Sequence, residues 1–153
     1  MHGNPRLALL RTERTSDPAV IAQQPLMTSV NSALQVDLFA QANASWVRGR
    51  IYSGLGGQSD FVVGALHAIG GQAVVALPSW HPRADVSTVV PVLAGPVTSF
   101  QHSWVVTEQG AAAITPEPLA VQARNLIDCA AHPDARAALE QAAADHGVLR
   151  SAR

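Results

Sequence analysis

Short apolar runs recur along the chain, and longer segments of helical character follow near its end. The run Gln72–Leu77, QAVVAL, is continuously apolar and is typical of a buried strand. Further strands are predicted at 6–11, at 26–38 as one long strand or a bent pair, at 44–51, at 87–93 around Pro91, and at 103–107. Helices are predicted at Leu119–Ala131 and Ala135–Ala144. Strands with interleaved helices, followed by helices, predict an α/β domain.

Two shorter helices are predicted from capping residues. Ser16-Asp17-Pro18 combines an N-cap with a proline at the first helical position, which predicts a short helix through Gln24. Ser59-Asp60 predicts the cap of a helix that reaches about Ala68 and ends at Gly70-Gly71. Residues 79–85, SWHPRAD, are predicted as a loop.

Composition narrows the class of protein. A chain of 153 residues fits one domain, so we expect residues 1–153 to form a single unit. The formal net charge of −1 gives no electrostatic reason to expect nucleic acid or a membrane surface as partner. No apolar run is long enough to span a bilayer and the N-terminus is not a signal peptide, so we expect a cytoplasmic protein. Cys129 is the only cysteine, which excludes an intrachain disulfide.

The glycine-rich run 49–61, GRIYSGLGGQSDF, is the strongest candidate for chemistry. Gly54, Gly56 and Gly57 fall between a β segment and a predicted helix, where glycine allows positive φ and lets a ligand approach the backbone. Exposed N–H groups at such a turn can bind an anion or an oxyanion. The alternative is a tight turn with a bulge. The run matches neither GxGxxG nor a Walker sequence.

The blocks around this run carry a family resemblance. They are NSALQVDLFAQANA (31–44), GRIYSGLGGQSDF (49–61), GGQAVVALPS (70–79), VSTVVP (86–91), WVVTEQG (104–110) and AHPDARAALEQAA (131–143). In this order, over nearly the whole chain, the sequence resembles the C-terminal domain of the acetyl-CoA hydrolase/transferase family. That family includes succinyl-CoA:acetate and 4-hydroxybutyrate CoA-transferases.

The resemblance implies a fold, a substrate and a site. The fold is an open, mostly parallel sheet flanked by helices, of the CoA-transferase/ribose-5-phosphate-isomerase kind. The substrate is an acyl-CoA, and coenzyme A is exchanged through an enzyme-bound glutamyl-CoA thioester. The implied thioester contacts are Gly57 and Ser16, and the implied CoA-binding residues are Gly54, Gly56, Gly57, Gln58 and Arg83. Glu108, in TEQG, is implied to organise a loop near the site, and His132 to cap a helix.

Several positions depart from the family pattern. The catalytic glutamate of the family lies in a segment similar to E-M-x-S-D-G, which does not occur here, so no catalytic residue is assigned. Ser16 stands where the family has asparagine, and serine offers fewer hydrogen-bonding groups than an amide. The family lysine that binds the CoA phosphates aligns with Pro82, which leaves Arg83 as the nearest cation. Arg83 is alternatively a solvent-exposed loop residue.

Two functions are expected from these observations. The first is the CoA-binding half of an acyl-CoA:carboxylate CoA-transferase or an acetyl-CoA hydrolase. We expect it to be inactive without an N-terminal domain that supplies the glutamate, and we expect that domain to be a partner chain. The alternative is a non-catalytic module that self-associates, with no CoA site. In either case we expect a homodimer, because a domain built to pack against another exposes apolar surface when alone. The six histidines show no metal-binding spacing, so no metal is expected.

Overall fold

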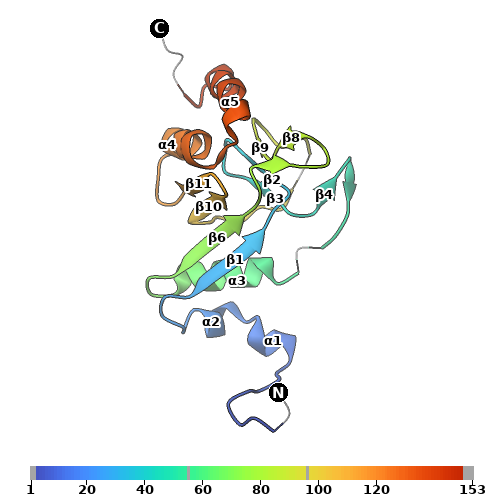
Figure 1. Ribbon diagram of the computed structural model, residues 1–153. Coiled ribbons are helices and arrows are strands. Elements are labelled where there is room, and N and C mark those ends of the chain that lie inside the picture. Colours follow the sequence, from blue (N-terminus) through green and yellow to red (C-terminus); the bar gives the residue numbers. More distant parts are fainter. Residues whose placement is uncertain (1–2, 55, 96, 150–153) are drawn as a thin grey trace.

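A four-stranded sheet lies at the centre of the fold (Figure 1). In the computed structural model the described residues are 3–54, 56–95 and 97–149. The sheet order is β1 (Thr28–Ser32), β6 (Gln72–Ala76), β10 (Trp104–Thr107) and β11 (Gly110–Ala113). The pairs β1–β6 and β6–β10 are parallel, whereas β10 and β11 form an antiparallel hairpin. The sheet is therefore open and mostly parallel, as predicted.

Helices cover both faces of this sheet (Figure 1). On one side α3 (Gln58–His67) packs against β1 and β6, and α2 (Pro18–Ile21) packs against α3. On the other side α4 (Leu119–Asn125) packs on β11, and the π-helical turn η1 (Leu126–Ala130) packs on β10 and β11. The predicted helix 119–131 is thus present, with a π-helical last turn.

The core lies between the sheet and the C-terminal helices. Fully buried side chains alternate along the strands, as the period of two requires, and meet apolar residues of η1 and α5 (Pro133–Asp145). The largest fully buried apolar side chains are Val36, Leu38, Val75, Val89, Val105, Leu126 and Ile127. The predicted helix 135–144 corresponds to α5, and the His132 side chain accepts a hydrogen bond from the Asp134 N–H at its start, which confirms His132 as its cap.

Smaller β elements surround the central sheet. β2 (Gln35–Asp37) pairs with β3 (Ala42–Asn43) and β9 (Val89–Val90) in a three-stranded sheet. β4 (Trp46–Val47) and β5 (Arg50–Ile51) form a projecting hairpin, and β7 (Trp80–His81) pairs with β8 (Val86–Ser87) in another. The segment 26–38 is therefore a bent pair of strands that belong to different sheets.

Some expected elements are absent or different. Residues 6–11 form no strand; they pair with no described strand, and Leu9 is 94% exposed. Residues 12–15 instead form a short helix, α1 (Thr12–Thr15). Asp17 caps α2 and Pro18 begins it, as predicted, but the helix ends at Ile21 and not at Gln24. Within the predicted loop 79–85, Trp80 and His81 form strand β7, whereas residues 82–85 are the turn that leads to β8.

The start of α3 also differs from the prediction. Neither Ser59 nor Asp60 caps this helix, because it already begins at Gln58, with Gly57 in the N-cap position. As a glycine, Gly57 has no side chain that could accept a hydrogen bond from the first turn. Within the described residues, none of the helices combines the length and the apolar character that crossing a membrane would require.

Candidate functional site

The glycine-rich loop closes a polar hollow at the carboxyl end of β1. This loop hollow has a volume of about 390 Å³ and is lined by Asn31, Ser32, Ala44, Gly54, Gly57, Gln58 and Phe61. It is bounded by the end of β1, by the loop after β5 and by the first turn of α3. Ligands of open α/β sheets bind outside the carboxyl ends of the parallel strands, so this is the expected position for a site.

The backbone requires glycine at one position of the loop but not at the other two. Gly56 has a φ of +59°, a conformation that favours glycine. Gly57 has a φ of −85°, and a Cβ added there would meet nothing closer than Phe61 Cδ2 at 3.6 Å. A Cβ on Gly54 would meet no atom within 4 Å. The fold therefore does not require glycine at 54 or 57, whereas a ligand that approaches the backbone would.

Ser16 lies beside Gly57, although the two residues are 41 positions apart. The Ser16 Oγ is 3.9 Å from the point where a Cβ on Gly57 would lie. Helix α2 holds Ser16 there, because α2 packs tightly on α3. A Cβ on Gly64 of α3 would be only 2.5 Å from Ile21 of α2. The family resemblance implied that Ser16 and Gly57 contact the same thioester. In the structure these two residues are indeed neighbours.

Asn31 contributes a polar side chain to the loop hollow that sequence reasoning missed. It lines the hollow, and its Nδ2 is covered and has no hydrogen-bond partner. Ser29, two residues earlier on the same face of β1, also has an unpartnered buried Oγ. A buried polar group without a partner costs about 1–3 kcal/mol. The signal in the sequence was polar residues at the alternate positions 29 and 31, which face inward on a strand whose other residues are exposed.

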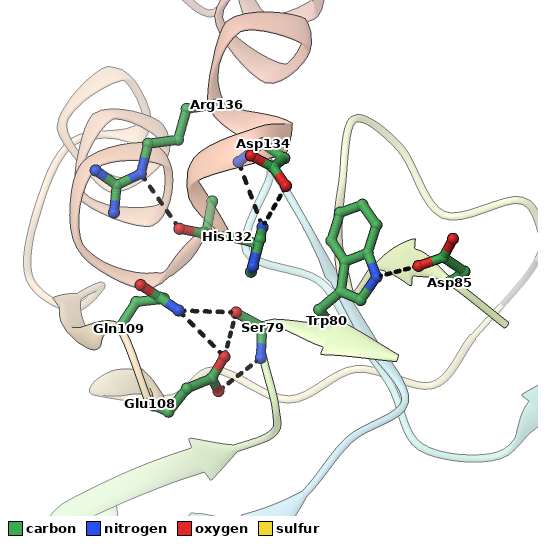
Figure 2. A network of polar contacts seen from close by, with 9 residues as sticks. Ser79, Trp80, Asp85, Glu108, Gln109, His132, Asp134 and Arg136 are labelled. Atoms are coloured by element: carbon green, nitrogen blue, oxygen red, sulfur yellow. Dashed lines mark hydrogen bonds and ion pairs between the residues drawn. The ribbon is translucent and has the colours of Figure 1, made fainter. Parts of the chain in front are cut away.

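A second group of polar contacts fixes the chain after β6 (Figure 2). The Glu108 carboxylate, at the β10–β11 turn, accepts hydrogen bonds from the Ser79 N–H at 2.9 Å and from the Ser79 hydroxyl. Gln109 Nε2 donates to the same carboxylate at 3.3 Å. The Ser79 hydroxyl and N–H lower the pKa of Glu108 from 4.5 to about 2. Glu108 therefore stays ionised and organises this loop, as the resemblance implied.

The β7–β8 hairpin that carries Arg83 begins directly after Ser79. Its Trp80 ring lies 4.8 Å from the ring of His132, and its indole N–H donates to Asp85 at 2.9 Å (Figure 2). Arg83 itself is exposed near the tip and does not line the loop hollow. The structure thus brings together Ser16, Gly54, Gly57 and Gln58, with Gly56 in the same loop, and leaves Arg83 apart from them.

Comparison with known proteins shows which family the chain belongs to. Residues 1–143 match the family described as the acetyl-CoA hydrolase/transferase C-terminal domain. The chain belongs to this family. It is 37% identical to the succinyl-CoA:acetate/propanoyl-CoA:succinate CoA transferase of Fasciola hepatica, over 95% of this chain and 31% of that protein. It is 36% identical to the 4-hydroxybutyrate coenzyme A transferase of Clostridium kluyveri, over 91% of this chain and 33% of that protein.

The fold agrees with solved structures of similar sequence. The crystal structure of RipA from Yersinia pestis matches with a TM-score of 0.82 at 37% identity, over 90% of this chain and 31% of RipA. The chain therefore spans about a third of the length of the relatives it matches. The family resemblance and the α/β fold expected from the sequence are both confirmed.

In this acetyl-CoA hydrolase/transferase C-terminal domain, none of the four glutamates lines the loop hollow. Glu13 pairs with Arg11 at the surface, Glu140 pairs with Arg124, and Glu108 is held by Ser79. Among the described residues, histidine, cysteine and acidic side chains do not gather in groups of three or more that could hold a metal ion. The chemistry that the hollow offers is therefore hydrogen bonding to a polar or anionic ligand.

Proposed function

We propose that this domain binds an acyl-CoA thioester in the loop hollow, as the CoA-binding part of an acyl-CoA:carboxylate CoA-transferase or acetyl-CoA hydrolase. The observation that carries the proposal is the absence of side chains at Gly54 and Gly57, which the backbone does not demand, beside a polar hollow. The relatives from Fasciola hepatica and Clostridium kluyveri are named as CoA transferases, which supports the substrate class.

The hollow suits the charge that forms during acyl transfer. When a carboxylate attacks a thioester, negative charge develops on the carbonyl oxygen and needs donors. The first N–H groups of α3 have no side-chain cap, and they carry the partial positive charge of a helix N-terminus. The Ser16 hydroxyl beside Gly57 and the amide of Asn31, which lines the hollow together with Gly57, add side-chain donors.

We propose that the attacking carboxylate is a glutamate from outside these 153 residues. The glutamate oxygen attacks the acyl carbonyl and expels the CoA thiolate, which leaves an acyl-glutamyl anhydride. The thiolate then attacks the glutamyl carbonyl, the anhydride bond breaks, and the glutamyl-CoA thioester forms while the acyl group leaves as a free carboxylate. None of the glutamates of this chain lines the hollow, and the relatives are about three times longer. An N-terminal domain that meets the loop hollow would supply the glutamate.

Calorimetric titration of the 153-residue chain with acetyl-CoA tests the binding proposal. We expect saturable binding that Gly57→Val weakens, because its side chain occupies the thioester position while the backbone at −85° accepts it. Ala138→Val, at an exposed position of α5, is the matched control and is expected to bind normally. Unchanged binding by Gly57→Val would contradict the proposal. Turnover of acetyl-CoA and a carboxylate by the chain alone would contradict an external glutamate.

Self-association remains the second candidate function, and exposed apolar side chains favour it. Val30, on the β1 edge of the central sheet, is 65% exposed. At the amino end of β1, Leu26 and Ile69 are 74% and 82% exposed, and the Leu26 N–H donates to the Ile69 carbonyl. We propose that this edge is buried in a homodimer. Sedimentation equilibrium tests it, with Val30→Thr expected to shift the chain toward monomer; a monomer at all concentrations would refute it.

A further inference from the structure

A short apolar segment near the start of the chain lies entirely at the surface. Residues 6–11, RLALLR, directly precede α1, and every one of them is exposed. Leu7, Leu9 and Leu10 are 53%, 94% and 59% exposed. Helix α1 buries none of its own residues, so it does not draw the segment into the core. Apolar side chains that gather in this way on the surface of a folded domain mark a contact surface.

The same segment has the character of a strand that lacks a neighbour. Its sequence predicts a strand, and it contains neither proline nor glycine. Arg11, at its end, has an extended backbone with φ −68° and ψ 149°. Within the described residues, the N–H groups of residues 8–11 donate no backbone hydrogen bond. These groups are therefore available to pair with the edge of a sheet.

Strand β1 offers such an edge. It is the first strand in the order β1, β6, β10, β11, so its outer side faces no other described strand. Exposed edges are commonly protected by charged residues, proline or a bulge. The sequence of β1, TSVNS, has no charge and no proline, and its register with β6 is continuous. Nothing in β1 itself therefore prevents another strand from pairing with it.

The segment does not reach this edge within one chain. Helices α1 and α2 lie between residues 6–11 and β1, and α2 is fixed on α3 by the close contact of Ile21 with Gly64. Figure 1 shows the N-terminal segment beyond α1 and directed away from β1. One molecule thus holds a segment of strand character without an edge, and an edge without a strand.

We propose that residues 6–11 of one copy pair with the β1 edge of a second copy, which returns the same contact. The inference rests on the homodimer proposed above and names the segment that covers its β1 edge. The reciprocal exchange is closed by a two-fold axis, the commonest symmetry of protein dimers. The six residues of the segment match the five residues of β1 in length. In such strand addition, main-chain hydrogen bonds provide affinity and side chains provide specificity.

A direct pairing of the two β1 edges is the simpler dimer, but it buries less apolar surface. The exposed side chains of β1 are Thr28, Val30 and Ser32, of which only Val30 is apolar. Such a dimer would also leave the three leucines of residues 6–11 in water. The exchange covers both the leucines and Val30, and burial of apolar surface is the main favourable contribution to association.

Sedimentation equilibrium of Leu9→Ser tests the leucine contact. Leu9 is 94% exposed, so the fold of the single chain does not depend on it. We expect the dimer Kd to rise about a hundredfold, because each of the two equivalent contacts loses a factor of about ten. Leu119→Ser is the control, since α4 packs on β11 at the opposite edge of the sheet, and should leave the Kd unchanged. Equal effects of the two variants would refute the exchange.

Amide hydrogen exchange tests the strand pairing itself. In a concentrated, dimeric sample, amides within residues 8–11 should be protected at alternate positions, because successive N–H groups of a strand point to opposite edges. In a dilute, monomeric sample the protection should disappear. Unprotected amides in the dimer would refute strand pairing. Protection that persists in the monomer would show that the segment pairs with β1 of its own chain, and would refute the exchange between copies.

This inference and the proposed homodimer fail in different ways. A monomer at all concentrations would refute both. A dimer that Val30→Thr weakens but Leu9→Ser leaves intact would refute the exchange alone and favour direct pairing of the β1 edges. Circular dichroism and thermal unfolding of each variant exclude loss of fold as the cause. The binding of acetyl-CoA in the loop hollow is tested separately and does not depend on these outcomes.

Discussion

The Glu108 carboxylate accepts hydrogen bonds from both the N–H and the hydroxyl of Ser79. This contact joins the β10–β11 turn to the chain that leaves β6, 29 residues away in sequence. Because Ser79 directly precedes the β7–β8 hairpin, Glu108 fixes the base of this hairpin. The carboxylate therefore has a structural role at the edge of the site rather than a nucleophilic one.

Replacement of Glu108 by Gln should lower the free energy of unfolding by about 1 kcal/mol, because a neutral amide accepts weaker hydrogen bonds than a carboxylate. The value is modest because the carboxylate is exposed and water screens it. Urea unfolding at pH 7 measures it. Glu13→Gln is the control, since the Glu13–Arg11 pair is fully at the surface and should matter less. Equal losses in the two variants would contradict the role of Glu108.

The contribution of Glu108 should also depend on pH with a defined sign. Folding lowers its pKa from 4.5 to about 2, so above pH 4.5 the contribution is complete. As pH falls from 4.5 toward 2, the unfolded chain takes up the proton first and the contribution is lost. The difference in unfolding free energy between wild type and Glu108→Gln should therefore shrink between pH 4.5 and pH 3. A constant difference would show that the pKa is not lowered.

His102 should destabilise the fold in mild acid. It is 2% exposed, its Nδ1–H donates to the Phe100 carbonyl at 3.0 Å, and its buried Nε2 has no partner. Burial lowers its pKa below 6.5, and the Phe100 hydrogen bond opposes this only in part. Below pH 6.5 the unfolded chain binds this proton more readily than the folded chain does. The free energy of unfolding should therefore decrease as the pH is lowered. His102→Gln should flatten that slope in urea titrations between pH 7.5 and 5.5. An unchanged slope in His102→Gln would contradict this role of His102.

The central fold could be predicted because its elements show strong local patterns. QAVVAL corresponds to β6 and SWVVT to β10, since β-branched apolar residues at successive positions favour a strand. RLALLR has an equally apolar pattern but no strand beside it, and hydrogen-bond partners cannot be read from a local run. Strand β11, GAAA, was missed because glycine and alanine have low strand propensity; it forms because the turn at 108–109 returns the chain along β10.

The candidate site could be predicted only in part. The glycine loop was visible because glycine spacing is a local signal, and Ser16 entered through the family resemblance. Asn31 was missed because its role depends on the hollow that it lines, and this follows from how distant segments pack. Arg83 was favoured by its position in the alignment, yet it lies at an exposed hairpin tip.

Gly64→Ala should destabilise the chain by about 1–3 kcal/mol, because the new Cβ would overlap Ile21 at 2.5 Å and force α2 away from α3. Gly57→Ala should be tolerated, since its nearest neighbour would be 3.6 Å away. Thermal unfolding measures both. Acetyl-CoA binding should show the opposite order, with Gly57→Ala weakening it by placing a methyl group beside the Ser16 hydroxyl. Similar stability losses in the two variants would contradict the packing described for α2.

Asn31→Ala should separate binding from stability. Its Nδ2 is buried without a partner, so its removal leaves no donor unsatisfied and should keep or raise the unfolding free energy. The same change removes a donor from the loop hollow, so affinity for acetyl-CoA should fall while affinity for free CoA, which has no thioester carbonyl, stays the same. Ser29→Ala is the matched control: its Oγ is also buried and unpartnered on the same strand, but Ser29 does not line the hollow. Binding should therefore be unchanged in Ser29→Ala, and an equal loss of affinity in both variants would show that strand β1, not the Asn31 amide, is responsible.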